Sequence, residues 1–314
     1  MSAAVQPAPS TFTPTQSQLV VAYAVCRGIA RKAAKNFYYA FLVVPTPKRQ
    51  ALCAVYAFMR RCDDITDDTT LPLHERQQKL ATWLDALHRA VAGMPTDEPV
   101  LLALTDAQRR FNIPLELLDQ LAQGTGMDVD LEEQLICEQT EPTVTVFYQT
   151  FEDLRLYCYR VASVVGLVCI RIFGYRDPAA EPLAERCGLA FQLTNIIRDV
   201  KEDAQMGRVY LPEEDLRKFG VFPLELRTAT DGTKFRALLA AEADRARDCY
   251  KAGDELVPLI DEDSQPALWA LITIYRRLLE KITLSQYEVF RAKISLSTFE
   301  KLTVLVKALT KRVS

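Results

Sequence analysis

The sequence predicts an all-α protein that forms one domain, and three observations support this prediction. Glycine is scarce, with 11 among 314 residues, and alternation of period two, typical of strands, is rare. Apolar residues recur at helical spacing, for example at Leu80, Trp83, Leu84, Leu87 and Val91. No repeat or linker interrupts the chain after residue 17. We therefore expect ten or more helices arranged around a central cavity.

The first 17 residues differ in composition from the rest of the chain. They are rich in Ala, Pro, Ser, Thr and Gln and contain no Lys or Arg, so they predict a disordered tail without the positive region of a signal peptide. The folded domain is expected to span residues 18–314. Its longest apolar run, residues 161–170, is too short to cross a bilayer, so no transmembrane anchor is expected.

Several short signals mark where helices begin and end. Starts are indicated at Thr46 before Pro47, at Thr150 before two acidic residues, and at Ser297 with Glu300 three residues later. Gly93 and Gly174 are expected to end helices. Residues 143–148 alternate like a strand, but we see no partner for a single strand and do not predict a sheet.

The composition excludes several classes of function. A net charge of -3 argues against nucleic-acid binding. Only two histidines occur, His74 and His88, both on a polar helix, so zinc chemistry and histidine-based triads are not expected. The eight cysteines show no CxxC spacing and lie mostly in apolar runs, which predicts buried thiols in the reducing cytoplasm.

Two acidic clusters stand out, and each begins where an apolar helix ends. On a helix, residues four apart share a face, so Asn195, Asp199 and Asp203 form one oxygen-bearing stripe. The earlier cluster repeats this spacing, with Asp63 before Asp67 and Asp64 before Asp68. Like charges at this spacing destabilise a helix by about 0.2 to 0.5 kcal/mol per pair. A bound cation would offset this repulsion.

The residues that precede the clusters favour a metal site over an ordinary acidic surface. Residues 51–59 and 188–197 are almost entirely apolar, as is typical of buried helices. The alternative is a solvated helix face with surface pairs from Arg60 to Asp64 and from Arg198 to Glu202. That alternative suits one cluster better than two that both grow out of core helices. Mg²⁺ prefers oxygen ligands and often binds one or two carboxylates together with substrate phosphate, so we predict a Mg²⁺ and diphosphate site.

Phosphate contacts are expected from side chains, because the known phosphate-binding loops are absent. The sequence has no Gly-x-x-x-x-Gly-Lys-Ser/Thr loop, and residues 124–126 lack the third glycine of a dinucleotide fingerprint. Basic residues near the clusters are the candidates, namely Lys35, Arg60, Arg198 and Arg208. NADPH use is not visible in the sequence and stays open.

Six segments, in order, resemble those of the squalene and phytoene synthases. They are residues 36–41, 54–60, 63–67, 157–162, 192–203 and 207–212. The resemblance extends over residues 20–300. It implies an isoprenoid synthase fold and the Mg²⁺-dependent head-to-head condensation of two prenyl diphosphates, with two or three ions bound.

The resemblance also implies roles for individual residues. It assigns the metal ligands to Asp63, Asp64, Asp67, Asn195, Asp199 and Asp203. It places Tyr157 near the reacting carbons, so that the catalytic set is Tyr157, Asp63, Asp67, Asp199 and Asp203. The expected substrate-binding residues are Lys35, Phe37, Tyr56, Arg60, Gln192, Arg198, Arg208, Tyr210 and Tyr275. Aromatic side chains near the motifs are expected to line the cavity, among them Tyr38, Tyr39, Phe41, Phe58, Tyr159 and Phe191.

Residues 159–163 and 171–174 resemble presqualene diphosphate synthases more than plant phytoene synthases. The resemblance therefore favours farnesyl diphosphate as the substrate, with presqualene diphosphate or squalene as the product. Three alternatives stay open: a phytoene synthase that uses geranylgeranyl diphosphate, a terpene cyclase, and a catalytically inactive helical assembly factor. The basic C-terminal end, with Lys301, Lys307, Lys311 and Arg312, is compatible with peripheral contact with the inner face of a membrane. The oligomeric state is left open.

Overall fold

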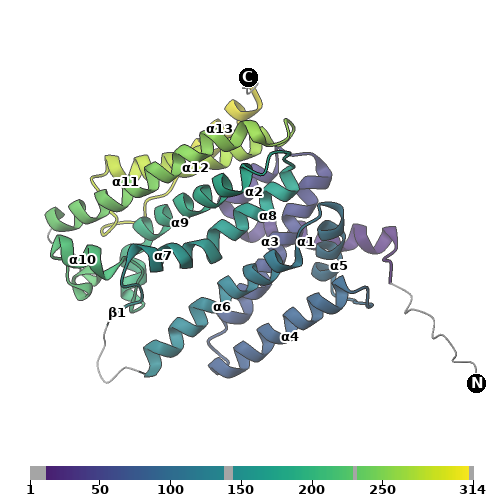
Figure 1. Cartoon of the computed structure of the whole chain (residues 1–314), viewed down its shortest axis with the longest axis horizontal. Helices are drawn as coiled ribbons and strands as arrows, with labels where there is room; N and C mark the ends of the chain where they lie inside the picture. The colour runs from purple at the N-terminus through teal and green to yellow at the C-terminus, as the bar shows by residue number, and fades with distance from the viewer. Residues whose placement is uncertain (1–11, 138–143, 229–231, 311–314) are drawn as a thin grey trace, which may run out of the picture.

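The structure is a computed structural model, and it describes residues 12–137, 144–228 and 232–310 (Figure 1). For residues 35, 36 and 128–137 it describes the backbone alone. The predicted tail lies mostly outside these ranges. Helix α1 begins at Gln16, where Thr15 accepts a hydrogen bond from the Gln18 main chain in a capping box.

The all-α class predicted from the sequence is confirmed. The first half of the described chain forms α1 (Gln16–Ala33), α2 (Lys35–Phe41), α3 (Thr46–Thr66), α4 (Leu73–Val91), α5 (Pro99–Arg110) and α6 (Leu115–Cys137). The second half forms α7 (Phe151–Cys158), α8 (Val164–Phe173), α9 (Ala180–Gln205), α10 (Glu213–Phe219), α11 (Gly232–Leu256), α12 (Gln265–Leu284) and α13 (Thr298–Thr310). A π-helical turn, Tyr159–Ser163, joins α7 to α8, and short 3₁₀ turns occur at Pro223–Arg227 and Val257–Leu259.

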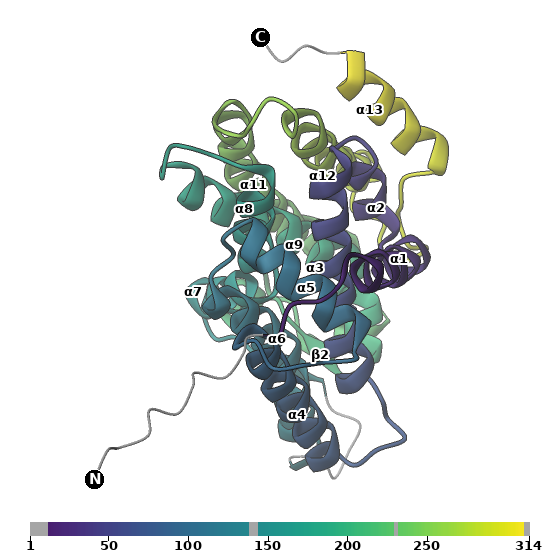
Figure 2. The ribbon, with the colours of Figure 1, turned by 90° about the vertical axis from the view of Figure 1, so that its right-hand side faces the viewer.

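The two acidic helices occupy the centre of the two halves of the molecule. Helix α3 packs against α1, α5, α6 and α4, whereas α9 packs against α11, α8 and α12. Helix α8 contacts both central helices and lies between them. Figure 1 shows α11, α12 and α13 along one side of the molecule and α4 and α6 along the other, and Figure 2 shows α1 and α13 at the periphery.

Most of the predicted helix ends are confirmed. The Thr150 Oγ1 accepts a hydrogen bond from the Asp153 main chain, and the Asp153 carboxylate accepts one from Thr150 N at 2.9 Å. Ser297 and Glu300 form the same box before α13. Gly93 and Gly174 follow α4 and α8 with positive φ angles of 86° and 81°. Helix α3 begins one residue earlier than predicted: Pro45 is the N-cap residue, and Thr46 is the first residue of the helix.

The expectation that no sheet would form was wrong. Strand β1, Thr145–Val146, pairs in parallel with β2, Arg208–Val209. Thr145 lies opposite Arg208 in this pairing. The partner consists of two residues and is more than 60 positions away, so no local pattern could reveal it. The pairing fixes the segment that carries Arg208 beside the start of α7.

Helices α7 and α8 form one continuous helix, Phe151–Phe173, that is longer than the apolar run in the sequence suggests. Within the described residues it is the one helix long and apolar enough to cross a membrane by length and composition. Half of its most apolar window is buried inside the protein, and α8 and the π-helical turn pack against α9 and α6. This burial is typical of a core helix.

Most of the cysteines whose side chains are described are buried, as predicted, and Cys169 and Cys249 are half-buried. Five are buried: Cys26, Cys53, Cys62, Cys158 and Cys187. Burial raises the pKa of Cys26, Cys62 and Cys187 to about 12, so these thiols stay protonated at neutral pH. The Cys137 side chain lies outside the described part of the chain.

Candidate active site

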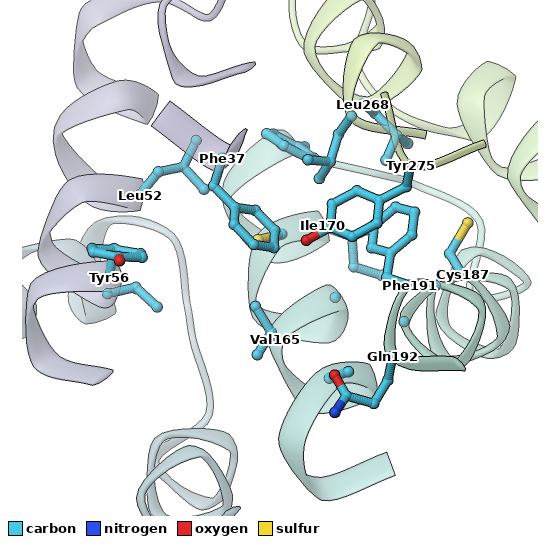
Figure 3. A pocket seen from close by; sticks show the side chains of 18 of the residues that line it. Phe37, Leu52, Tyr56, Val165, Ile170, Cys187, Phe191, Gln192, Leu268 and Tyr275 are labelled. Atoms are coloured by element: carbon cyan, nitrogen blue, oxygen red, sulfur yellow. The ribbon is translucent and has the colours of Figure 1, made fainter. Parts of the chain in front are cut away.

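An apolar cavity of about 220 Å³ lies between the two central helices (Figure 3). Side chains from α2, α3, the π-helical turn, α8, α9, α11 and α12 line it. The residues on the two acidic helices are Leu52, Val55, Tyr56 and Met59 from α3, and Ala184, Cys187, Gly188, Phe191, Gln192 and Asn195 from α9. The predicted central cavity is therefore present, and both acidic helices contribute to its wall.

Both acidic clusters follow the same end of this cavity. In Figure 3, Tyr56 lies below Leu52, and Gln192 lies below Phe191. Asp63 lies one turn after Met59, and Asp199 lies one turn after Asn195. We call the end of the cavity formed by Tyr56, Gln192 and Asn195 the mouth. Each acidic cluster therefore begins about one helical turn beyond a residue that lines the cavity.

Stacked aromatic rings form part of the cavity wall. Phe191 stacks on Tyr275 with ring centroids 4.4 Å apart, and the Phe37 ring lies 5.9 Å from Tyr275. Three of the aromatic residues expected in the wall line it: Phe37, Phe41 and Phe191. Five others do not, namely Tyr38, Tyr39, Phe58, Tyr157 and Tyr159. Their position close to the motifs in sequence does not indicate which helix face they occupy.

The first cluster is shorter than the sequence analysis expects. Helix α3 ends at Thr66. The next residue, Asp67, still donates a helical hydrogen bond from its main-chain N to the Asp63 carbonyl oxygen at 2.8 Å. Asp68 lies beyond the helix and accepts hydrogen bonds from Thr70. The expected pair of Asp64 with Asp68 on one helix face is therefore wrong. Asp63 and Asp67 keep the spacing of four residues.

Arg60 and Asp64 pair with each other at the outer side of this cluster. The Arg60 guanidinium lies 2.6 Å from the Asp64 carboxylate, and both side chains are exposed to solvent by 40% or more. Such an exposed pair contributes less than about 1 kcal/mol, so it breaks at little cost when a ligand competes for either partner. The Arg60–Asp64 pair expected of a solvated helix face is thus present, and it lies next to the mouth.

The second cluster lies on one half-buried face of α9. Both oxygens of Asp199 accept hydrogen bonds from the adjacent Arg198, and Lys293 Nζ lies 2.9 Å from Asp199 Oδ1. Burial would raise the pKa of Asp199, but Arg198 and Lys293 outweigh it and hold that pKa below its usual value. Asp199 is therefore ionised at neutral pH, as a metal ligand requires.

Asn195 provides a direct test of whether these residues fit Mg²⁺. Its Oδ1 atom is buried and has no hydrogen-bond partner among the described residues, while its Nδ2 donates to Gln192 at 3.4 Å. An unpaired buried oxygen costs free energy unless a ligand satisfies it. Across the part of the chain that the structure describes, no three or more acidic, His or Cys side chains form a ready metal cage. Asn195 Oδ1 and the ionised Asp199 carboxylate are oxygen donors of the kind that Mg²⁺ binds.

Tyr157 lies in an aromatic cluster beside the cavity, one helical turn before the lining residue Val161. Its ring stacks on Tyr210 at 5.3 Å and lies 5.4 Å from Tyr148. All three rings are at least 91% buried. The pairing of β1 with β2 places Tyr148 and Tyr210 together, so this small sheet supports the position of Tyr157.

The remaining predicted substrate contacts are placed as follows. Tyr56, Gln192 and Tyr275 line the cavity, and Arg208 is half-buried in β2. Burial raises the pKa of Tyr56, so its hydroxyl stays protonated and able to donate a hydrogen bond. The side chain of Lys35 lies outside the described part of the chain. Asp203 is half-buried on the same face of α9 as Asp199.

Sequence reasoning missed the closed end of the cavity and one cation at the mouth. Leu268 and Leu271 on α12 line the cavity, and their spacing with Tyr275 could have indicated this face. Lys48, one turn before the lining residue Leu52, lies toward the opposite end from the mouth, where its Nζ binds Asp263 at 2.5 Å and Ser264 at 3.0 Å. Lys293 lies in a loop, and no sequence pattern indicates its position.

Comparison with known proteins identifies the family. The squalene/phytoene synthase family model matches residues 30–300. Phytoene synthase of Mycobacterium bovis is 38% identical over 302 residues, covering 95% of this chain and 94% of the relative. The 15-cis-phytoene synthase of Synechococcus elongatus is 34% identical over 310 residues, covering 93% and 94%.

Solved structures agree with this similarity. A dehydrosqualene synthase crystal structure superimposes with a TM-score of 0.81 and 32% identity, covering 94% of this chain and 97% of that one. The squalene synthase HpnC from Alicyclobacillus acidocaldarius gives a TM-score of 0.75 at 30% identity, covering 87% and 97%. The chain therefore belongs to the squalene/phytoene synthase family of prenyltransferases and has its isoprenoid synthase fold.

Proposed function

We propose that this protein condenses two molecules of geranylgeranyl diphosphate head to head to form phytoene, with release of both diphosphates. The observation that carries the condensation is the apolar cavity that α3 and α9 both line, each about one turn before its acidic cluster. The resemblance of individual motifs favours farnesyl diphosphate. The similarity to proteins named phytoene synthase, over more than 90% of both chains, supports the longer substrate instead.

The composition of the cavity wall suits a prenyl chain. Small residues make up much of the wall on the side of α8 and α9: Ala162, Gly166, Cys169, Ala184, Cys187 and Gly188. Small side chains leave room between the helices that larger ones would fill. The polar lining residues of α3 and α9 lie at the mouth, so the diphosphates would bind there while the prenyl chains extend toward Phe173 and Leu268.

The residues at the mouth suit the first chemical step, which breaks a carbon–oxygen bond and leaves negative charge on diphosphate. Arg60 and Arg198 offer guanidinium groups whose geometry suits phosphate oxygens. Mg²⁺ held by Asp63, Asp67, Asn195, Asp199 and Asp203 would supply the main electrostatic stabilisation of the leaving diphosphate.

The apolar wall suits the carbocation that this step leaves behind. The stacked rings of Phe191 and Tyr275 exclude water, and aromatic faces stabilise cations by about 0.5 to 2 kcal/mol each. A double bond of the second substrate then attacks the cation, and loss of a proton closes a cyclopropane. Ionisation of the second diphosphate, rearrangement and loss of another proton give phytoene without a reductant. The proposal therefore requires no NADPH.

Product analysis tests this proposal. Purified protein is incubated with Mg²⁺ and either geranylgeranyl or farnesyl diphosphate, with and without NADPH, and the products are identified by mass spectrometry. We expect a C40 product from geranylgeranyl diphosphate that does not depend on NADPH. Exclusive formation of a C30 product would favour the squalene-type reaction, a cyclic product from one substrate would favour a cyclase, and no diphosphate release would refute the enzymatic proposal.

We also propose that the protein works in the cytoplasm and contacts a membrane surface through α13. On this helix large apolar side chains recur every three or four residues, with Phe299 74%, Val306 61% and Leu309 64% exposed. Such a face, next to Lys301 and Lys307, is typical of helices that lie in the lipid interface, and a hydrocarbon product needs an apolar phase. Sedimentation with anionic vesicles tests this, with wild type expected to bind more strongly than a Phe299→Ser, Leu309→Ser variant. Equal sedimentation of the two proteins would contradict it.

A further inference from the structure

We propose that Lys293 is a positioning cation that leaves Asp199 when a divalent metal binds and then pairs with the diphosphate. This inference rests on the proposed function, and it concerns a residue outside the predicted site. Lys293 lies in the segment between α12 and α13, far in sequence from both acidic clusters. Its Nζ lies 2.9 Å from Asp199 Oδ1 and also forms an ion pair with Glu202.

The loop that carries Lys293 is firmly attached on both sides of this residue. Val289 and Leu296 are 3% and 7% exposed, so both are anchored in the core. Lys201 Nζ donates to the Phe290 carbonyl at 2.5 Å, and the Phe290 ring packs 5.3 Å from that of Phe235. The backbone near Lys293 is therefore held beside α9, whereas its own side chain is 48% exposed and free to change rotamer.

The donors around Asp199 set up a competition with any metal ion. Arg198 Nε lies 2.9 Å from Asp199 Oδ1, the same oxygen that Lys293 binds, and the second guanidinium nitrogen of Arg198 binds Oδ2. A divalent ion that takes Asp199 as a ligand must displace at least one of these donors. Lys293 is the more exposed of the two, with Arg198 only 18% exposed, so Lys293 is the donor that leaves at lower cost.

The displaced ammonium group stays close to the mouth because its loop is anchored. A metal ion on Asp199 brings diphosphate with it, since Mg²⁺ keeps most of its coordination for phosphate and water. The released Lys293 then meets several acceptor oxygens of opposite charge. Lys293 therefore weakens the binding of metal alone, because it competes for Asp199. It strengthens the binding of diphosphate to the metal-loaded protein, because its charge is then available to the phosphate oxygens. The two ligands strengthen each other's binding through this residue.

Two binding measurements on the full chain test this inference without turnover. Binding of Mn²⁺ alone is followed by electron paramagnetic resonance, and binding of inorganic pyrophosphate at saturating Mn²⁺ by calorimetry. For Lys293→Gln we expect Mn²⁺ alone to bind about twofold to fivefold more tightly. Pyrophosphate should bind about tenfold more weakly. A residue that only supports the fold would not shift the two affinities in opposite directions.

A matched control separates the charge of Lys293 from the stability of its loop. Lys281 ties the same segment down by donating to the Ser295 carbonyl at 3.0 Å and to Glu300 at 3.3 Å. Lys281→Gln should leave both affinities unchanged, and Lys293→Arg should restore most of the pyrophosphate affinity. The inference is overturned if Lys293→Gln matches wild type, or if both affinities fall together. If wild type binds no Mn²⁺ even with pyrophosphate, the proposed function itself fails.

Discussion

Lys48 Nζ, near the start of α3, donates a hydrogen bond of 2.7 Å to the main-chain carbonyl of Phe173, at the end of α8. The same ammonium group binds Asp263 and Ser264 just before α12, so one side chain joins three cavity-forming helices at the closed end. Each of these helices places a lining residue next to this junction: Leu52, Phe173 and Leu268. The closed end of the cavity is therefore held by a polar contact behind its apolar wall.

Replacing Lys48 by Met should destabilise the protein by about 2 kcal/mol. The Lys48 side chain is only 13% exposed, and its removal leaves the surrounding acceptors without a donor. Urea unfolding followed by circular dichroism measures this change. Lys251→Met is the control, since Lys251 is 73% exposed and forms an ion pair with Asp248. We expect the control to change stability by less than about 0.5 kcal/mol. Equal effects of the two substitutions would contradict the role of Lys48.

Gly188 allows α9 to approach the π-helical turn. A Cβ atom at this position would lie 2.5 Å from Ser163 Cα and 2.8 Å from the Ala162 carbonyl oxygen. Gly188→Ala should therefore cost about 1 to 3 kcal/mol and narrow the cavity, because both backbones must shift. Thermal unfolding measures the loss.

Gly28 provides the comparison for this substitution. It lies within α1, and a Cβ atom there would have nothing within 4 Å. Gly28→Ala should stabilise the protein by up to about 1 kcal/mol, since alanine favours helix more than glycine does. A Gly188→Ala protein as stable as wild type would show that the close contact is not required.

Glu242 is expected to make stability depend on pH. It is fully buried, and its Oε1 accepts a hydrogen bond of 2.7 Å from Arg245, which also binds Asp215 at 2.6 Å. Burial raises the pKa of Glu242 to about 7, against the attraction of Arg245, and Asp215 adds to the rise. The folded protein thus binds a proton more tightly than the unfolded chain. Its stability should fall as pH rises from about 4.5 through 7, by roughly 3 kcal/mol for this group.

Glu242→Gln tests this pH dependence, because glutamine keeps the shape and does not titrate. As pH rises from 5 to 8, the unfolding free energy of wild type should fall relative to that of the variant. Glu255→Gln, at an exposed position on the same helix, is the control and should follow wild type. A Glu242→Gln profile parallel to that of wild type would show that Glu242 does not titrate in this range.

Asp63→Asn and Asp199→Asn should each lower turnover by about 100-fold or more, since each removes a charged ligand from the mouth. Far-ultraviolet circular dichroism should stay unchanged, because apolar packing stabilises both helices. Asp85→Asn, at an exposed position on α4, is the control for the loss of one negative charge. Near-normal turnover in either variant would remove that residue from the proposed site.

The fold class and the position of the two acidic helices could be predicted because the relevant signals are local. The apolar run before Asp63 is buried as predicted, with Leu52 and Phe58 among the least exposed side chains. The same is true of α9, where Ile196 and Ile197 are buried beside the half-buried Asp199. A helix that is apolar all round has to be buried, so its sequence alone indicates where it lies.

The features that could not be predicted depend on contacts between distant segments. The pairing of Thr145 with Arg208 joins two strands of two residues each, too short to show a period. Lys48 and Lys293 look like surface lysines in sequence, and only the packing of the helices brings each of them against buried or half-buried acceptors. The orientation of Phe58 toward Trp83 was missed for the same reason.

The most direct test of the central claim is where metal ions bind when substrate is present. Crystals grown with Mn²⁺ and a non-hydrolysable thiolo analogue of geranylgeranyl diphosphate would locate the ions by anomalous scattering. We predict Mn²⁺ ions at both acidic clusters, on Asp63 or Asp67 and on Asn195, Asp199 or Asp203, joined by the oxygens of the bound diphosphates at one mouth. Metal at one cluster alone, or diphosphate bound away from the mouth between α3 and α9, would contradict the account.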